Sequence, residues 1–221
     1  WGSSAIVVER GGVVTLPNSA SEKTRTMNRR ASGTLLSNCT FTNNMAITNG
    51  GAVWLGSPAQ LDGNTFVGNT AQGRDGRGGA VFVLGGISGD GVSLSNCTFT
   101  NNMAIAAGGA VYLASSAQLD GNTFVGNTAQ NPDEREGGGA VFVSQTICGE
   151  GLSLSNCTFT NNTATSGSGG AVVIASSRSV QLDRNTFVSN TALTGGAISV
   201  RFGISGEGPS LSNCTFTNNM A

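Results

Sequence analysis

Two short motifs alternate along most of this chain, and their recurrence constrains the fold more than any other feature. Seven Phe residues are each followed by Asn three positions later and by Ala two positions after that, as in Phe99, Asn102 and Ala104. Six Gly-Gly-Ala triplets lie between these segments, for example the triplet that ends at Ala110. Internal repeats of this length are typical of solenoids, in which each repeat is one unit stacked on the next.

The repeats come in two alternating forms. One form reads L-S-N-C-T-F-T-N-N, as in residues 94–102, and the other reads L-D-G-N-T-F-V-G-N, as in residues 61–69. The pair recurs every 57 to 60 residues. Residues 37–72 and 95–130 are nearly the same sequence, which indicates duplication. We therefore expect a structural period of two repeats.

The residue pattern within each repeat is that of β-strands. Apolar and polar residues alternate over short runs, as in residues 97–100, and Gly and Asn bound these runs. A single rung cannot bury its own inner face, so rungs must stack, about 4.8 Å apart. We predict an all-β fold, a right-handed single-stranded parallel β-helix of about seven rungs. Residues 33–221 form the regular repeats, expected to continue beyond the chain end, and residues 1–32 form an irregular N-terminal rung with a long basic loop.

Alignment of the repeats places equivalent residues in columns. The Leu and Phe columns, represented by Leu94 and Phe99, should face the interior with the apolar residues that follow each Gly-Gly-Ala triplet. Between the Leu and Phe columns stands Asn or Gly, as a tight left-handed corner requires. Arg184 occupies one of these corners and breaks the rule.

Four of the five cysteines fall in one inward column, in alternate rungs. Two rungs of separation exceed the roughly 7 Å between Cα atoms that a disulfide can span. We expect these thiols to be free and buried, without a zinc site. The four are Cys39, Cys97, Cys157 and Cys214. Cys148 lies alone in a loop, and whether it forms a disulfide stays open.

Composition narrows the classes of function. Only 10% of the residues are charged and the net charge is −1, which disfavours nucleic acid and anionic membranes as partners. No apolar run approaches the roughly 18 residues of a membrane span. The chain has no His, the commonest general base. The acids Asp62, Asp120 and Asp183 obey the repeat, as turn-capping residues do. We therefore predict no catalytic residue, no metal site and no cofactor.

The outward side of the Phe strands carries a ladder of Thr. One column is Thr in every rung, and the next alternates Thr with Val. The Thr residues of this candidate surface ladder are Thr40, Thr42, Thr65, Thr98, Thr100, Thr123, Thr158, Thr160, Thr186, Thr215 and Thr217. Ice-binding β-solenoids present similar ranks of Thr, which makes ice binding a rival hypothesis. The plainer interpretation is β-propensity, since Thr and Val suit exposed strands.

Two further sets of residues are candidate contact or modification sites. Four aromatics should point outward from the strands after the Gly-Gly-Ala triplets and form an apolar patch, covered by the chain's own loops or by a partner subunit or glycan. They are Trp54, Phe82, Tyr112 and Phe142. Five Asn residues lie in Asn-x-Thr sequons, which are either N-glycosylated or bonded between rungs and closed to modification. They are Asn38, Asn96, Asn156, Asn161 and Asn213.

The alternation of seven F-x-x-N segments with six G-G-A triplets resembles the repeat of the chlamydial-type polymorphic outer membrane proteins. The resemblance covers residues from about 33 to 221. It implies an extracellular or cell-surface β-helix, often an adhesin. We predict a non-enzymatic structural or adhesive β-helix, either a segment of a larger surface protein or a filament subunit. Its partners would be copies of itself, other surface proteins or glycans. The alternatives are an ice-binding protein and, third, a polysaccharide-active enzyme.

Overall fold

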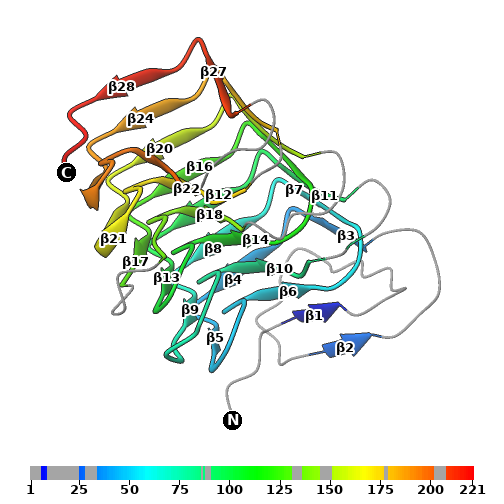
Figure 1. The fold of residues 1–221 in the computed structure, drawn as a ribbon. Helices are drawn as coiled ribbons and strands as arrows, with labels where there is room; N and C mark the ends of the chain where they lie inside the picture. Colours follow the sequence, from blue (N-terminus) through cyan, green and yellow to red (C-terminus); the bar gives the residue numbers. More distant parts are fainter. Residues whose placement is uncertain are drawn as a thin grey trace.

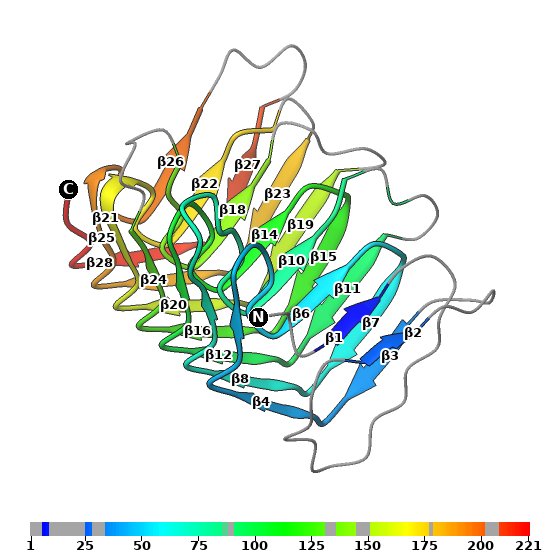
Figure 2. The same ribbon diagram turned by 90° about the horizontal axis from the view of Figure 1, so that it is seen from below.

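The computed structural model describes residues 6–8, 25–27, 34–85, 87, 91–130, 136–144, 151–176, 179–201 and 208–221. These residues form strands and turns without a helix. From β3 onward the strands stack in chain order along a rod, with β4 near one end and β28 at the other (Figure 1). Each turn of the chain contributes one short strand to each of four parallel sheets, here named A to D (Figure 2).

Sheet A carries the strands after the Gly-Gly-Ala triplets, and sheet B carries the Leu strands. Sheet A consists, in spatial order, of β2 (Arg25–Met27), β1 (Ile6–Val8), β6 (Val53–Leu55), β10 (Val81–Val83), β14 (Val111–Leu113), β18 (Val141–Val143), β22 (Val172–Ile174) and β26 (Ile198–Val200). Sheet B consists of β3 (Thr34–Ser37), β7 (Ala59–Asp62), β11 (Val92–Ser95), β15 (Ala117–Asp120), β19 (Leu152–Ser155), β23 (Val180–Asp183) and β27 (Ser210–Ser212).

The other two sheets carry the Phe strands and the short strands that follow them. Sheet C consists of β4 (Thr40–Thr42), β8 (Thr65–Val67), β12 (Thr98–Thr100), β16 (Thr123–Val125), β20 (Thr158–Thr160), β24 (Thr186–Val188) and β28 (Thr215–Thr217). Sheet D consists of β5 (Met45–Ala46), β9 (Thr70–Ala71), β13 (Met103–Ala104), β17 (Thr128–Ala129), β21 (Thr163–Ser168) and β25 (Thr191–Thr194).

The strands pair in register with the equivalent strands of the neighbouring rungs, except that the pairing of β21 with β25 shifts between Ala164 and Ser168. Phe99 of β12 is paired with Phe124 of β16, and their rings stack with centroids 4.8 Å apart. That spacing is the distance between hydrogen-bonded strands. The predicted parallel β-helix of about seven rungs is therefore confirmed. Of the predicted N-terminal rung, residues 1–32, only β1 and β2 are described, so its irregular form and basic loop stay predictions.

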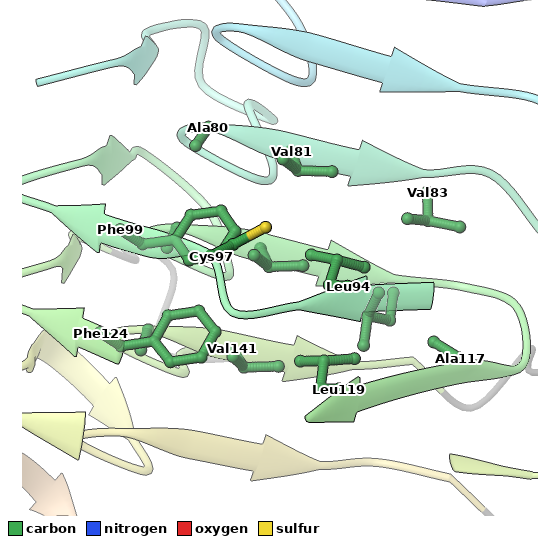
Figure 3. Close-up of a cluster of buried hydrophobic side chains, with 14 of the residues drawn as sticks. Ala80, Val81, Val83, Leu94, Cys97, Phe99, Ala117, Leu119, Phe124 and Val141 are labelled. Carbon is green, nitrogen blue, oxygen red and sulfur yellow. The ribbon is translucent and has the colours of Figure 1, made fainter. Parts of the chain in front are cut away.

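The interior is filled by the predicted apolar columns. Leu94 and Phe99 of one rung lie next to Leu119 and Phe124 of the following one, and all four are buried (Figure 3). Val141 of sheet A faces the same core. The Leu and Phe of the last described rung are about half exposed because no further described rung covers them: Leu211 and Phe216.

A column of buried asparagines explains the Asn of the F-x-x-N motif. The Asn102 amide nitrogen donates to the Phe66 carbonyl of the preceding rung (3.0 Å) and to Asn127 Oδ1 of the next rung (3.0 Å). The Asn102 backbone N–H also donates to Asn127 Oδ1 (2.9 Å). A short side chain with both an amide donor and a carbonyl acceptor is needed for this pattern. The ladder joins each rung to both of its neighbours.

The two glycines of each Gly-Gly-Ala triplet have different physical roles. Gly108 has a φ of 62°, a left-handed conformation that most residues avoid. Gly109 lies where a side chain has no room, since a Cβ there would stand 2.0 Å from the Gly139 carbonyl oxygen of the next rung. The triplet is therefore a corner at which two rungs approach in close backbone contact.

Replacement of a central Phe should strongly destabilise the rod. We expect Phe124→Ala to lower the free energy of unfolding by about 3–5 kcal/mol, because it leaves a cavity between two stacked rings. The control Thr123→Ala, in the same strand but facing outward, should change it by only about 0.5 kcal/mol. Urea denaturation followed by circular dichroism measures both. Similar losses for the two variants would contradict the stacked core.

Candidate functional site

The outward side of sheet C is a flat surface with two columns of side chains, which we call the Thr face. The pairing places Thr98 beside Thr65 and Thr123, while Thr100 lies between two valines. The predicted Thr ladder is thus brought together in register along seven strands. The members at the two ends are exposed and those in the middle are half-buried. Whether the ladder is a binding site stays a prediction.

One edge of the Thr face is the corner between sheets B and C, where acids, serines and asparagines interlock. Ser155 Oγ donates to Asp120 Oδ1 (2.7 Å), and so does the side-chain nitrogen of Asn156 (2.7 Å). These two hydrogen bonds hold the pKa of the Asp120 carboxyl below its usual value. Equivalent bonds from Ser212 and Asn213 lower the pKa of Asp183. Asp120 and Asp183 are therefore ionised and fixed in position by bonds to the next rung, and their role as turn caps stays a prediction.

Arg184 fits the corner by ion pairing. It adopts the left-handed conformation of its neighbours, with a φ of 52°. Its guanidinium contacts Asp183 Oδ2 (2.9 Å), and its Nε donates to Asn156 Oδ1 of the preceding rung (3.0 Å). These contacts compensate for a conformation that is unfavourable for Arg.

The sequon asparagines are all exposed at left-handed corners. Their side chains lie outside the buried Asn ladder of the F-x-x-N motifs. Three of them are nonetheless engaged between rungs, because their amide nitrogens donate to the preceding Asp: Asn96, Asn156 and Asn213. Glycosylation itself stays a prediction.

The exposed corner asparagines explain the alternation of repeat types. A Cβ on Gly121 would lie 2.9 Å from Asn96 Oδ1, so the Asn side chain occupies the space that a side chain at the next corner would need. The same relation holds at the second corner between Asn101 and Gly126. An Asn corner is therefore followed by a Gly corner up to residue 126, which gives this part of the array its period of two rungs; after Asn156 and Asn161 the corner residues are Arg184 and Ser189 instead.

The cysteine column faces inward, as predicted. Cys39, Cys97 and Cys157 are buried and Cys214 is half-buried, and no two of these four thiols are joined by a disulfide. Burial raises the pKa of Cys97 and of Cys157 to about 11, despite hydrogen bonds that act the other way. Such thiols stay protonated and unreactive at neutral pH. Cys148 lies outside the described residues.

The aromatic column lies outside the main core, on the outer side of sheet A. Trp54, Phe82, Tyr112 and Phe142 do stack, with centroids 5.2–6.4 Å apart. However, Phe82, Tyr112 and Phe142 are only 5–7% exposed, and Trp54 is half-buried. They form a second apolar cluster outside the main core, packed with alanines of the adjoining turns such as Ala107 and Ala114. The sequence left open whether the chain itself, a partner or a glycan covers these aromatics, and in the structure the chain's own turns cover them.

An ion pair lies beside this second cluster. The Arg77 guanidinium stands 5.4 Å from the centre of the Tyr112 ring and makes two hydrogen bonds to the Glu136 carboxylate (3.0 and 2.8 Å). Arg77 and Glu136 lie in loops that do not repeat, and no feature of the repeats predicted their pairing. Each of these loops directly precedes a Gly-Gly-Ala triplet. This shared position in the repeat is the one sequence signal that could have predicted that the two loops are in contact.

The described part of the chain contains no cluster of metal ligands. Within it, no three His, Cys, Asp or Glu residues are grouped so that they could hold a metal ion. The same residues include no helix long and apolar enough to cross a membrane.

Comparison with known proteins agrees with the geometry. Residues 1–148 match the model of the right-handed beta helix region, and residues 156–175 match the Chlamydia polymorphic membrane protein repeat. The first match covers most of the chain and supplies the handedness of the coil. No curated protein and no solved structure matches the chain.

The corner acids should make the rod sensitive to acid. The pKa values of Asp120 and Asp183 are lowered from 3.8 in the folded state, so the unfolded chain takes up protons first as the pH falls. Their stabilisation is present above about pH 4 and is lost below it. We expect the Tm to fall between about pH 4 and 2 in thermal scans. The variant Asp120→Ala/Asp183→Ala should show a smaller fall than a control with Asp75→Ala. Equal falls would contradict the role of the corner bonds.

Proposed function

We propose that this chain, which belongs to the right-handed β-helix family, is a non-enzymatic segment of a cell-surface protein that adheres through its regular outer faces. The Chlamydia polymorphic membrane protein repeat at residues 156–175 supports the surface location. The single observation that carries the adhesive role is the Thr face, an uncharged ladder that stays in register over seven strands.

The environment of the acids supports the non-enzymatic part of the proposal. A general acid requires a raised pKa and a general base requires an available carboxylate close to a bound substrate. The pKa values of Asp120 and Asp183 are lowered instead, and both side chains brace the next rung through Ser and Asn. Asp120 and Asp62 lie in alternate strands of sheet B, separated by Ser95, which holds them two rungs apart.

The Thr face is also better suited to contact than the other surfaces described. The aromatic cluster is closed by the chain itself, and the cysteines face inward. The Thr hydroxyls each supply a donor and an acceptor, and the intervening valines supply apolar contact. A flat surface of this kind suits a broad contact with another surface.

Adhesion should be lost when the Thr face is blocked. Beads coated with the chain should attach to animal cell monolayers, and Thr98→Tyr/Thr158→Tyr should reduce the attached number at least about fivefold, because two bulky rings interrupt a flat surface. Thr128→Tyr/Thr163→Tyr, on the outward side of sheet D, is the matched control. Attachment that persists in the first variant, or that is absent from the parent, would sink the proposal, as would cleavage of a polysaccharide by the pure protein.

Ice binding is the second candidate, favoured by the unbroken Thr column at one rung spacing. If it is correct, the parent protein should show thermal hysteresis that grows with concentration, and Thr98→Tyr/Thr158→Tyr should abolish it. The Val in alternate rungs of the second column interrupts the Thr-x-Thr pattern, and for this reason we rank ice below adhesion. A parent without hysteresis ends this candidate.

A further inference from the structure

We propose that the Thr face binds a neutral, extended polysaccharide that lies along the rod, parallel to the stacking direction. This inference rests on the proposed adhesive function and names the class of ligand for the same face. Four properties of the face lead to it: its area, its charge, its hydrogen-bonding groups and its period.

The area of the face disfavours a globular partner. Seven strands spaced about 4.8 Å apart, each three residues long, give a surface roughly 30 Å by 10 Å. That is about 300 Å², whereas a stable protein complex buries about 800 Å² on each partner. A long and narrow ligand uses such a strip fully, and it gains affinity with every unit that it lays along the strip.

Charge excludes the common polyanions. The two columns of the Thr face contain only Thr and Val. Along the edge stand the carboxylates of Asp120, which is exposed, and of Asp183, which pairs with Arg184. A row of carboxylates repels nucleic acid, sulfated glycans and anionic lipid. A neutral ligand meets no such penalty.

The hydrogen-bonding groups match sugar hydroxyls. Each Thr hydroxyl both donates and accepts, as a sugar hydroxyl does. At the edge, Oδ1 of Asp62 and of Asp120 is taken by Ser and Asn, while Oδ2 of each accepts no hydrogen bond from the described residues. A carboxylate oxygen of this kind is a strong acceptor for a hydroxyl donor. Val67 and Val125 supply apolar contacts for the C–H faces of sugar rings.

The period of the face matches a polymer rather than a single sugar. Equivalent rungs of the same type recur at twice the 4.8 Å spacing of the stacked rings, or about 9.6 Å. Two sugar rings of an extended β-1,4-linked chain have a similar length. One disaccharide can thus meet one Thr rung and one Val rung, and the next disaccharide meets the same pair of rungs again.

The test uses cello-oligosaccharides and chito-oligosaccharides of two to eight units, with heparin as the anionic probe, in isothermal titration calorimetry. Affinity for one neutral series should rise with length up to about six units, the span of the seven strands. The variant Thr98→Val/Thr123→Val/Thr158→Val keeps the shape and β-propensity of the face but removes three hydroxyls. It should weaken binding of the hexamer by about tenfold or more.

The control Thr128→Val/Thr163→Val changes the same residue type on sheet D and should bind as the parent does. Circular dichroism and urea denaturation confirm that each variant is folded. The inference is overturned if neither neutral series binds, if affinity does not depend on length, if the sheet D variant loses as much affinity as the Thr face variant, or if heparin binds more tightly than the hexamers. Coated beads that still attach to cells in that event leave the adhesive function standing, with a protein as the partner.

Discussion

Backbone hydrogen bonds between neighbouring rungs are the interaction on which everything else in this molecule depends. The Thr98 N–H donates to the Asn64 carbonyl of one neighbour, while the Thr123 N–H of the other neighbour donates to the Cys97 carbonyl. A rung therefore satisfies its own polar groups only when another rung lies 4.8 Å away with matching geometry. That requirement aligns equivalent residues in columns. Each column must therefore consist of residues whose side chains can pack against, or bond to, the side chain at the same position in the next rung.

The columns solve that requirement in different ways. Phe rings stack nearly parallel, with only 1° between Phe124 and Phe159. The ladder asparagines exchange amide hydrogen bonds, and the thiols of Cys97 and Cys157 alternate with Asn122, whose amide nitrogen also donates to the Leu94 carbonyl. Outside, Thr and Val fill the Thr face. The surface available for binding is thus a by-product of the same register that builds the core.

Much of this arrangement was predictable from sequence because it follows from translation by one rung. Once Phe99 and Phe124 are aligned, the inward columns, the left-handed corners and the cysteine column follow. The burial of Tyr112 was not predictable in this way. It depends on how the turn at Ala107 folds over sheet A, and on an ion pair between Arg77 and Glu136, which are 59 residues apart and lie in loops of unlike sequence. Contacts that do not repeat leave no periodic signal.

The Asn and Gly corners impose a rule of parity on how such an array can change in length. Asn96 lies over Gly121, so removal or addition of a single rung would set one Asn corner against another and one Cys against the next. An even number of rungs restores every contact. The near-identity of residues 37–72 and 95–130 is what a two-rung step leaves behind. Lengthening by such steps extends the Thr face without altering its pattern, so the length of the face grows in proportion to the number of two-rung units while the side chains of each unit stay the same.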